Sequence, residues 1–433
     1  MIASTNPAIR LASGSRPRRA IAALTSGVVL SFGLISVGVD PVNAAEPAKA
    51  PPKLAANADG SPTTAAAAAY AWSLFADAVA PTTGQAGPLT FENWTEQCVF
   101  HFAGCPTSTQ TAAKAVAAKG GKPARKAHGS GLRGKLAQAL NKSVTSGRDD
   151  SSVSCTTLQT PPTYPGVKPA QVVGQLFCEE IFVNPAETAF INTNGLATLT
   201  GQATYASKNG NQISLPWSAI EIKVDWVSQS SATCNSPTLY MEMIQFEGQP
   251  AQCFAMAGMH ISSKVLPNWL WATFEPANSP ANPNRCNPAL YGMCFDPWGT
   301  TSSVPYGMDN PAKQSPALAA LMKSKNLSAA FNNYFLTGVQ TQFVDSKGVA
   351  TQLGNSFVEY WAGVKPGQAS CITCHSYAVL QTNPPTEIGQ GAPTGAQIGP
   401  GATLSAGQVR QDFSWMLAFV PTLASPPPAA KKK

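Results

Sequence analysis

Charged residues are scarce in this sequence. Asp, Glu, Lys and Arg make up 12% of its 433 residues, about half of the ~25% that is usual in soluble proteins. Glycine and proline number 35 and 37, so we expect many loops.

The net charge of +7 is concentrated in the N-terminus and in residues 111–148, which hold nine Lys or Arg and no acid. This basic insertion resembles a solvated loop, with a docking patch for an acidic redox partner as the alternative, and predicts no nucleic-acid binding.

Several catalytic motifs are absent. The chain has no H-E-x-x-H, P-loop, G-x-G-x-x-G or G-x-S-x-G sequence, so nothing favours zinc hydrolysis, nucleotide binding or serine hydrolysis. Histidine occurs only four times. Glu179 and Glu180 are adjacent, but neighbours in a strand point to opposite faces, so they offer no acid/base pair.

The N-terminus has the pattern of a secretory signal peptide. Arginines precede twenty uncharged residues and the small-x-small sequence Val42-Asn43-Ala44. We therefore predict that residues 1–44 are removed and that the protein is exported, to the periplasm or beyond, with no membrane span left. The alternative is an uncleaved membrane anchor, because twenty uncharged residues could also span a bilayer.

Ten cysteines are present, and eight of them lie outside the motif described below. An even number of cysteines in an exported chain predicts disulfides, here four. Eight cysteines allow 105 pairings, and pairing between sequence neighbours is the simplest. These pairs are Cys98 with Cys105, Cys155 with Cys178, Cys234 with Cys253, and Cys286 with Cys294.

Alternating apolar residues predict an antiparallel sheet between residues 171 and 264. The clearest strand is AIEIKVDWV, residues 219–227, in which apolar residues alternate with Glu221, Lys223 and Asp225. The apolar face should pack on a core, and we expect the three charged side chains to face water. Two further strands and the hairpin between them are predicted at residues 239–246, 252–262 and 247–250.

Helical periodicity predominates after residue 313. The last helix is the best marked, since Ser405 and Gln408 have capping-box spacing and an apolar face that includes Phe413 and Met416 follows. The helices that we expect are residues 64–80, 315–323, 327–336, 355–362 and 406–420.

These patterns divide the chain after the signal peptide into a Pro- and Ala-rich linker at 45–63, a disulfide-bearing α+β region at 64–312, a mainly helical segment at 313–421, and a disordered tail at 422–433. The predicted fold class is α+β, with an antiparallel sheet in the N-terminal region.

One motif in the helical segment carries specific chemistry. Cys371, Cys374 and His375 form a C-x-x-C-H. Two thiols three residues apart on a helical turn can each form a thioether with a haem vinyl group, and the imidazole then reaches the iron from the same side. The alternative is a redox dithiol, but the flanking sequence lacks the βαβ context of thioredoxin-like sites.

The motif resembles that of the c-type cytochromes. The resemblance implies one covalent haem c held by Cys371 and Cys374, with His375 as the proximal iron ligand. It also implies electron exchange with a redox partner protein or a small-molecule donor or acceptor. The helical segment would then be cytochrome-c-like. The larger chain is similar to exported bacterial cytochrome-c-family proteins without an assigned function.

The second iron ligand stays open. Met416 on the predicted last helix and His260 on a predicted strand are the candidates, while His101 and His128 are weaker ones. An open sixth position would instead make the protein a haem-dependent oxidoreductase with an upstream substrate pocket. The aromatic sequence WLWATFE, residues 269–275, could line such a pocket, although aromatic runs usually belong to a core.

Overall fold

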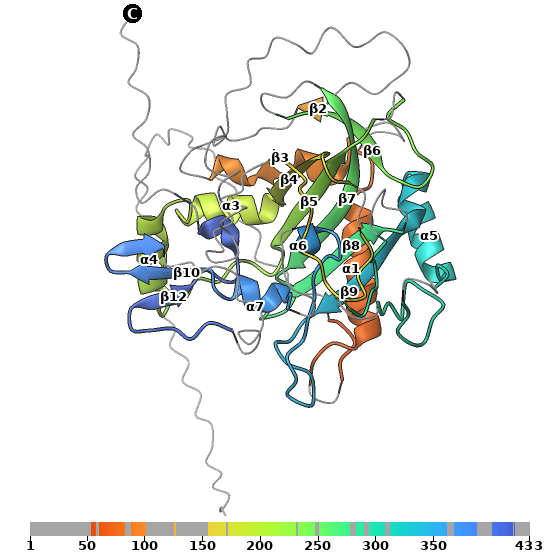
Figure 1. Ribbon diagram of the computed structural model, residues 1–433. Coiled ribbons are helices and arrows are strands. Elements are labelled where there is room, and N and C mark those ends of the chain that lie inside the picture. Colours follow the sequence, from red (N-terminus) through yellow and green to blue (C-terminus); the bar gives the residue numbers. More distant parts are fainter. Residues whose placement is uncertain are drawn as a thin grey trace, which may run out of the picture. The chain divides into compact units, whose positions relative to one another are not determined.

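The computed structural model (Figure 1) shows a chain dominated by β-sheet. It describes residues 53–57, 60–82, 88–100, 125–126, 155–169, 172–230, 233–246, 251–277, 283–289, 294–307, 312–361, 368–387, 401–418 and 420. The predicted signal peptide, the tail, and the basic insertion apart from residues 125 and 126 lie outside this range. None of the helices in the described residues combines the length and the apolar character needed to cross a membrane.

Within the described residues the main sheet has nine strands, hydrogen-bonded in the order β1-β4-β5-β7-β6-β2, with β3 on β4, β8 on β7 and β9 on β8. Their pairs are antiparallel, apart from β2 with β6. The strands are β1 Thr95–Glu96, β2 Arg125–Lys126, β3 Cys155–Thr157, β4 Leu176–Val183, β5 Ile220–Ser228, β6 Met241–Gln245, β7 Gln252–Ser263, β8 Leu270–Pro276 and β9 Tyr334–Gln340. The predicted strands are confirmed, whereas the hairpin turn at 247–250 lies outside the described residues.

The remaining elements are short. The helices are α1 Thr64–Ala78, α3 Pro185–Thr193, α4 Leu199–Lys208, α5 Pro316–Ser324, α6 Val358–Trp361 and α7 Cys371–His375. A second sheet, of order β11-β10-β12, is formed by β10 Val379–Thr382, β11 Pro385–Glu387 and β12 Gln408–Arg410. The 3-10 helices are η1 Thr90–Asn93, η2 Gln97–Val99, η3 Ala329–Asn333 and η5 Trp415–Leu417.

One face of the main sheet is apolar and packs against α1. Trp226 of β5, which alternates with the charged residues of that strand, is fully buried on this face. Phe75 of α1 stacks on Phe274 of β8 with ring centroids 4.5 Å apart, and Trp72 meets the same ring at 4.9 Å. Burial of these aromatic side chains supplies much of the hydrophobic stabilisation of the fold.

The opposite face of the sheet is polar but is also buried, so we call it the polar face. Asp225 is 0% exposed and Glu221 is 6% exposed. The prediction that the charged residues of this strand face water is therefore wrong for both. Residues of the segment 343–420 lie on this face, and this segment carries its own polar partners for the sheet, such as Asn355 and Ser356.

The predicted fold class fails in the C-terminal region, because no helical cytochrome-c-like segment is present among residues 313–421 as far as the structure describes them. The predicted helix at 315–323 is confirmed as α5. The predicted helix at 327–336 is instead η3 followed by β9, which joins the main sheet. That at 355–362 shrinks to the four residues of α6, and that at 406–420 becomes β12 and η5.

Tertiary contacts override the helical periodicity of residues 406–420. Asp412 and Phe413 have φ angles of 51° and 66°, which no right-handed helix accepts. Oδ1 of Asp412 lies 2.5 Å from the ammonium group of buried Lys264, and Oδ2 accepts a hydrogen bond from the Leu215 N–H at 2.7 Å. These contacts hold the chain in a left-handed turn, which a local apolar pattern does not reveal.

Three predicted disulfides are confirmed. Cys155–Cys178, Cys234–Cys253 and Cys286–Cys294 are bonded, with Cα atoms 4.1, 5.3 and 5.0 Å apart. The first ties β3 to β4, the second ties the start of β7 to the chain that precedes β6, and the third closes a loop after β8. The fourth predicted pair includes Cys105, which lies outside the described residues.

Candidate functional site

The C-x-x-C-H motif forms α7, which rests on the polar face of the sheet at the end of β9. The side chain of Gln340 fixes its N-terminus: Oε1 accepts a hydrogen bond from the Ile372 N–H at 2.9 Å, and Nε2 donates to the Ser370 hydroxyl at 2.9 Å. Ile372 is fully buried below the helix. The sheet therefore orients the motif through one glutamine and one apolar anchor, because a five-residue helix has little stability of its own.

The imidazole of His375 is held on two sides. Its Nδ1 atom lies 2.8 Å from the carbonyl oxygen of Phe413. Since a carbonyl only accepts, Nδ1 donates, and the lone pair of the neutral ring is on Nε2. The ring of Trp271 lies against the imidazole with centroids 4.4 Å apart. Metal-binding histidines typically use such a second hydrogen bond to fix the tautomer and the ring plane.

The two thiols of the motif are not joined in a disulfide, and both are half-buried. Sγ of Cys371 lies 3.4 Å from the Leu353 carbonyl oxygen, to which it can donate. Burial raises the pKa of Cys371 well above that of a free thiol, and the nearby Glu359 carboxyl raises it further. Redox dithiols need the opposite, a thiol whose pKa is lowered. The environment of Cys371 therefore argues against the dithiol alternative.

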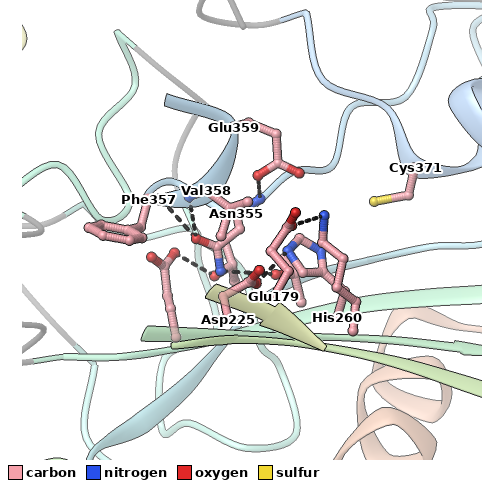
Figure 2. Close-up of polar contacts among 12 residues, drawn as sticks. Glu179, Asp225, His260, Asn355, Phe357, Val358, Glu359 and Cys371 are labelled. Carbon is pink, nitrogen blue, oxygen red and sulfur yellow. Dashed lines mark hydrogen bonds and ion pairs between the residues drawn. The ribbon is translucent and has the colours of Figure 1, made fainter. Parts of the chain in front are cut away.

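A polar cluster lies beside Cys371 (Figure 2). Figure 2 shows its side chains gathered above the sheet, with the Cys371 sulfur on the same side of the strands. Members come from β4, β5 and β7 below, and from α6 and the chain entering it above. We call the following residues the polar cluster: Glu179, Lys223, Asp225, His260, Asn355 and Glu359.

One ion pair and one histidine–carboxylate contact run across the strands of the polar cluster. Lys223 Nζ lies 2.5 Å from Glu179 Oε1, and His260 Nε2 lies 3.5 Å from Asp225 Oδ2. Burial lowers the pKa of His260, so this ring is neutral at neutral pH. Its side chain is 17% exposed, so the cluster is reached from solvent at this end.

Asn355 and Glu359 close the polar cluster from above. The Asn355 N–H donates to Glu359 Oε2 at 2.5 Å, and its side-chain amide donates to Thr273 Oγ1 at 3.3 Å. A Cβ atom on Gly258 would lie only 2.7 Å from the Asn355 amide nitrogen, so glycine is needed for this approach to the sheet. Burial raises the pKa of the Glu359 carboxyl.

The two candidates for the second iron ligand occupy different surroundings. His260 lies on the same face of the sheet as the motif, with its Nε2 atom directed at Asp225. Met416, on η5, is 1% exposed and packs in one apolar cluster with Ile372 and Leu417. Met416 lies three residues after Phe413, whose carbonyl oxygen accepts the hydrogen bond from His375 Nδ1. Its burial among apolar side chains is typical of a core methionine.

The aromatic sequence at 269–275 is divided between the two faces, as strand alternation requires. Trp271 lies on the polar face against His375, and Phe274 lies in the apolar core against α1. Glu275 is bound through both oxygens by the Ser356 hydroxyl, at 2.8 and 2.6 Å. Of Trp271, Phe274 and Glu275, only Trp271 contacts the imidazole of the motif.

Glu179 and Glu180 also diverge as expected. Glu179 pairs with Lys223 on the polar face, and Glu180 accepts a hydrogen bond from the Trp226 indole at 2.9 Å. They form no acid/base pair.

Sequence reasoning missed most of the residues around the motif: Asp225, Gln340, Asn355, Glu359 and Phe413. Asp225 lies in a strand whose polar positions resemble a solvent-exposed face, and Phe413 acts through a backbone carbonyl that any residue could supply. One signal in the sequence could have indicated Glu359: it is the single charged residue in the otherwise apolar sequence FVEYW, residues 357–361, which precedes the motif.

Comparisons with protein-family models, with curated proteins and with solved structures find no match. The resemblance to c-type cytochromes therefore stays a prediction from the motif. No group of three or more His, Cys, Asp or Glu is placed to hold a metal ion within the part of the chain that the structure describes. Haem iron takes one or two protein ligands, so such a group is not required for it.

Proposed function

We propose that the chain carries one haem c, bound covalently through Cys371 and Cys374 with His375 as the proximal iron ligand, and that it transfers electrons. The observation that supports this most is the hydrogen bond from His375 Nδ1 to the Phe413 carbonyl at 2.8 Å. It selects the tautomer with its lone pair on Nε2, which is the tautomer that an iron ligand needs.

Bound haem would supply a one-electron redox centre. The residues of the chain hold and orient the ligand. Gln340 fixes the start of α7, and Trp271 lies against the imidazole. The rigid sheet beneath both residues limits the movement of the imidazole. A site that keeps its geometry in both oxidation states suits electron transfer, because little reorganisation accompanies the electron.

The surroundings of the thiols also agree with covalent attachment. Both are half-buried and free of a disulfide, although the chain forms three disulfides elsewhere in the described residues. Cysteines that stay outside a disulfide in a disulfide-bearing chain suit another use. Thioether bonds to haem vinyl groups provide one.

The test is covalent haem staining of the full chain, expressed with its N-terminus in a bacterial host that matures c-type cytochromes. We expect a stained band of the mature protein and no stain in the Cys371→Ala/Cys374→Ala double variant. His260→Gln leaves the motif intact and is the matched control, which should keep the stain. An unstained wild-type protein that is exported and folded would refute the proposal.

A further inference from the structure

The polar cluster lies where it can sense the charge of a group bound at Cys371. Glu359 acts electrostatically on the Cys371 sulfur, and it also acts on His260. If a haem is attached through Cys371, the edge of the haem that is bonded to this sulfur would lie beside the polar cluster. An electron arriving there would change the local charge by one unit beside side chains that are buried or partly buried, where charges interact more strongly than in bulk solvent.

Acidic groups outnumber basic groups in the polar cluster. Its three carboxyls, Glu179, Asp225 and Glu359, face one lysine, and Lys223 is 2.5 Å from Glu179. The titratable groups that act on Glu359 are Lys223 and Asp225 on β5 and His260 on β7. Glu359 in turn acts on Cys371 of α7, and its neighbour His260 also senses Glu179 on β4 and Glu275 on β8.

The structure gives a reason for Glu359, rather than Glu179 or Glu275, to change protonation. Glu179 has Lys223 as a close cation, and Glu275 is held by two hydroxyl groups, those of Ser356 and Thr337. Glu359 accepts the Asn355 N–H at 2.5 Å and is partly buried, and desolvation in this environment raises the pKa of its carboxyl above the ordinary value. The protonation of such a carboxyl responds to a change of charge on a neighbouring group.

We propose that Glu359 takes up a proton from solvent when the haem attached at Cys371 is reduced, so that electron transfer by this protein is coupled to proton transfer. This inference rests on the proposed function. One electron arrives from the redox partner, one proton arrives from solvent at the exposed edge of His260, and both leave when the protein is oxidised again. No covalent bond changes other than the O–H bond of Glu359.

The sign of the coupling follows from electrostatics. Reduction removes one positive charge near Glu359, so its carboxylate loses stabilisation and its pKa is higher in the reduced protein. The midpoint potential therefore falls as pH rises between the oxidised-state and the reduced-state pKa. The equilibrium constant for reduction changes at most tenfold per pH unit, which for one electron corresponds to a change of 59 mV in the midpoint potential.

The experiment is redox potentiometry of the haem-loaded full chain across the pH range in which it stays folded, with proton uptake measured by an indicator dye in weakly buffered solution. We expect a potential that falls with pH and an uptake of up to one proton per electron. Glu359→Gln should lose most of the slope and most of the uptake. Glu242→Gln removes a buried carboxyl on β6 outside the polar cluster and should keep both.

A haem-loaded wild-type protein whose potential is independent of pH, and which takes up no proton on reduction, overturns this inference alone. This measurement needs no variant, so it decides the matter even where Glu359→Gln does not fold. An unchanged slope in folded Glu359→Gln also overturns it. Absence of covalent haem from the wild-type protein overturns the proposed function together with this inference.

Discussion

His375 donates its Nδ1 proton to the carbonyl oxygen of Phe413 over 2.8 Å, across 38 residues of sequence. Phe413 presents this oxygen because it and the preceding residue adopt left-handed backbone angles, with φ of 66° and 51°. Such angles cost energy for residues other than glycine and persist where the surroundings enforce them. Here the enforcing contact is the ion pair of Asp412 with Lys264. The orientation of the imidazole therefore depends on an ion pair that it does not touch, made by the residue that precedes Phe413.

This dependence predicts the effect of Asp412→Asn. The variant leaves the buried ammonium of Lys264 without its carboxylate, and loss of one partner from a buried pair typically costs about 3–5 kcal/mol of unfolding free energy. The midpoint of urea unfolding should fall accordingly. Adding Lys264→Met should restore much of the loss, because no uncompensated charge is left.

The exposed Asp345→Asn variant serves as control for the loss of one acidic residue. Equal stability of Asp412→Asn and the wild type would show that the ion pair does not hold the turn. If the chain carries the proposed haem, the haem-loaded Asp412→Asn protein should also show a shifted midpoint potential, since a hydrogen bond to a histidine that binds iron tunes the metal.

Gly258→Ala should destabilise the fold by roughly 1–3 kcal/mol, the usual cost of inserting a methyl group into a packed site. The added Cβ would lie 2.7 Å from the Asn355 amide nitrogen and 3.3 Å from Asp225 Oδ2. Asn355 has little freedom to move, because its Oδ1 also accepts from the Phe357 N–H at 2.9 Å. Thermal unfolding followed by circular dichroism measures the loss.

Gly307→Ala is the matched control for Gly258→Ala. Its nearest neighbour, the carbonyl oxygen of Cys286, would be 3.9 Å from the new Cβ, so the alanine has room. Similar melting temperatures for the two variants would contradict the role given to Gly258.

Much of the main sheet could be predicted from the sequence, because β5 alternates apolar and polar residues along its length and α1 is apolar and well delimited. The C-terminal region could not. Ser405 and Gln408 do interact, with the Ser405 N–H donating to Gln408 Oε1 at 2.8 Å, yet this contact closes a turn before β12 instead of starting a helix. The local signal was real, but long-range contacts of Asp412 decided the structure.

The buried polar face of the sheet explains why the prediction that Glu221 and Asp225 face water was wrong. Glu221 and Asp225 have the spacing of solvent-exposed residues, and a sequence does not show which distant segment will cover a strand. Cys371, Cys374 and His375 were recognisable because their spacing carries a specific chemistry. Their surroundings were not, because Gln340 and Glu359 act through contacts between segments far apart in the chain.

Stability should depend on pH through a buried pair of carboxyls, Glu187 and Glu221. Burial raises the pKa of Glu221 to about 7 from an ordinary 4.5, and burial raises that of Glu187 well above its usual range. Between pH 4.5 and about 7 the folded protein binds more protons at Glu221 than the unfolded chain does, so the unfolding free energy falls as pH rises, by roughly 3 kcal/mol.

Urea unfolding at pH 5 and pH 8 measures this loss. Glu221→Gln cannot ionise at this position, so it should show a smaller difference between pH 5 and pH 8 than the wild type, with the remainder due to Glu187, and it should be more stable than the wild type at pH 8. Asp77→Asn, at a carboxyl that is 58% exposed, should keep the wild-type difference. A wild-type protein that is more stable at pH 8 than at pH 5 would reverse the sign and refute the argument.

The second iron position can be tested with Met416→Leu and His260→Gln. Met416 is buried in an apolar cluster near the residue that accepts the Nδ1 proton of His375, and the Nε2 atom of His260 is directed at Asp225. We therefore expect neither variant to change the absorption spectrum of the haem-loaded protein. Met416→Leu, which nearly conserves volume, should cost less than about 1.5 kcal/mol of unfolding free energy.

Carbon monoxide provides the complementary measurement, because it binds reduced haem rapidly only where the sixth position is open or weakly held. If neither side chain is a ligand, the reduced wild-type protein should bind carbon monoxide at once, and both variants should do so at a similar rate. Loss of a six-coordinate spectrum in one variant alone, together with faster carbon monoxide binding, would instead identify that residue as the ligand. The two variants differ in what they remove, a thioether in the apolar cluster and an imidazole in the polar cluster, so a change confined to one variant would also tell on which side of the motif the haem lies.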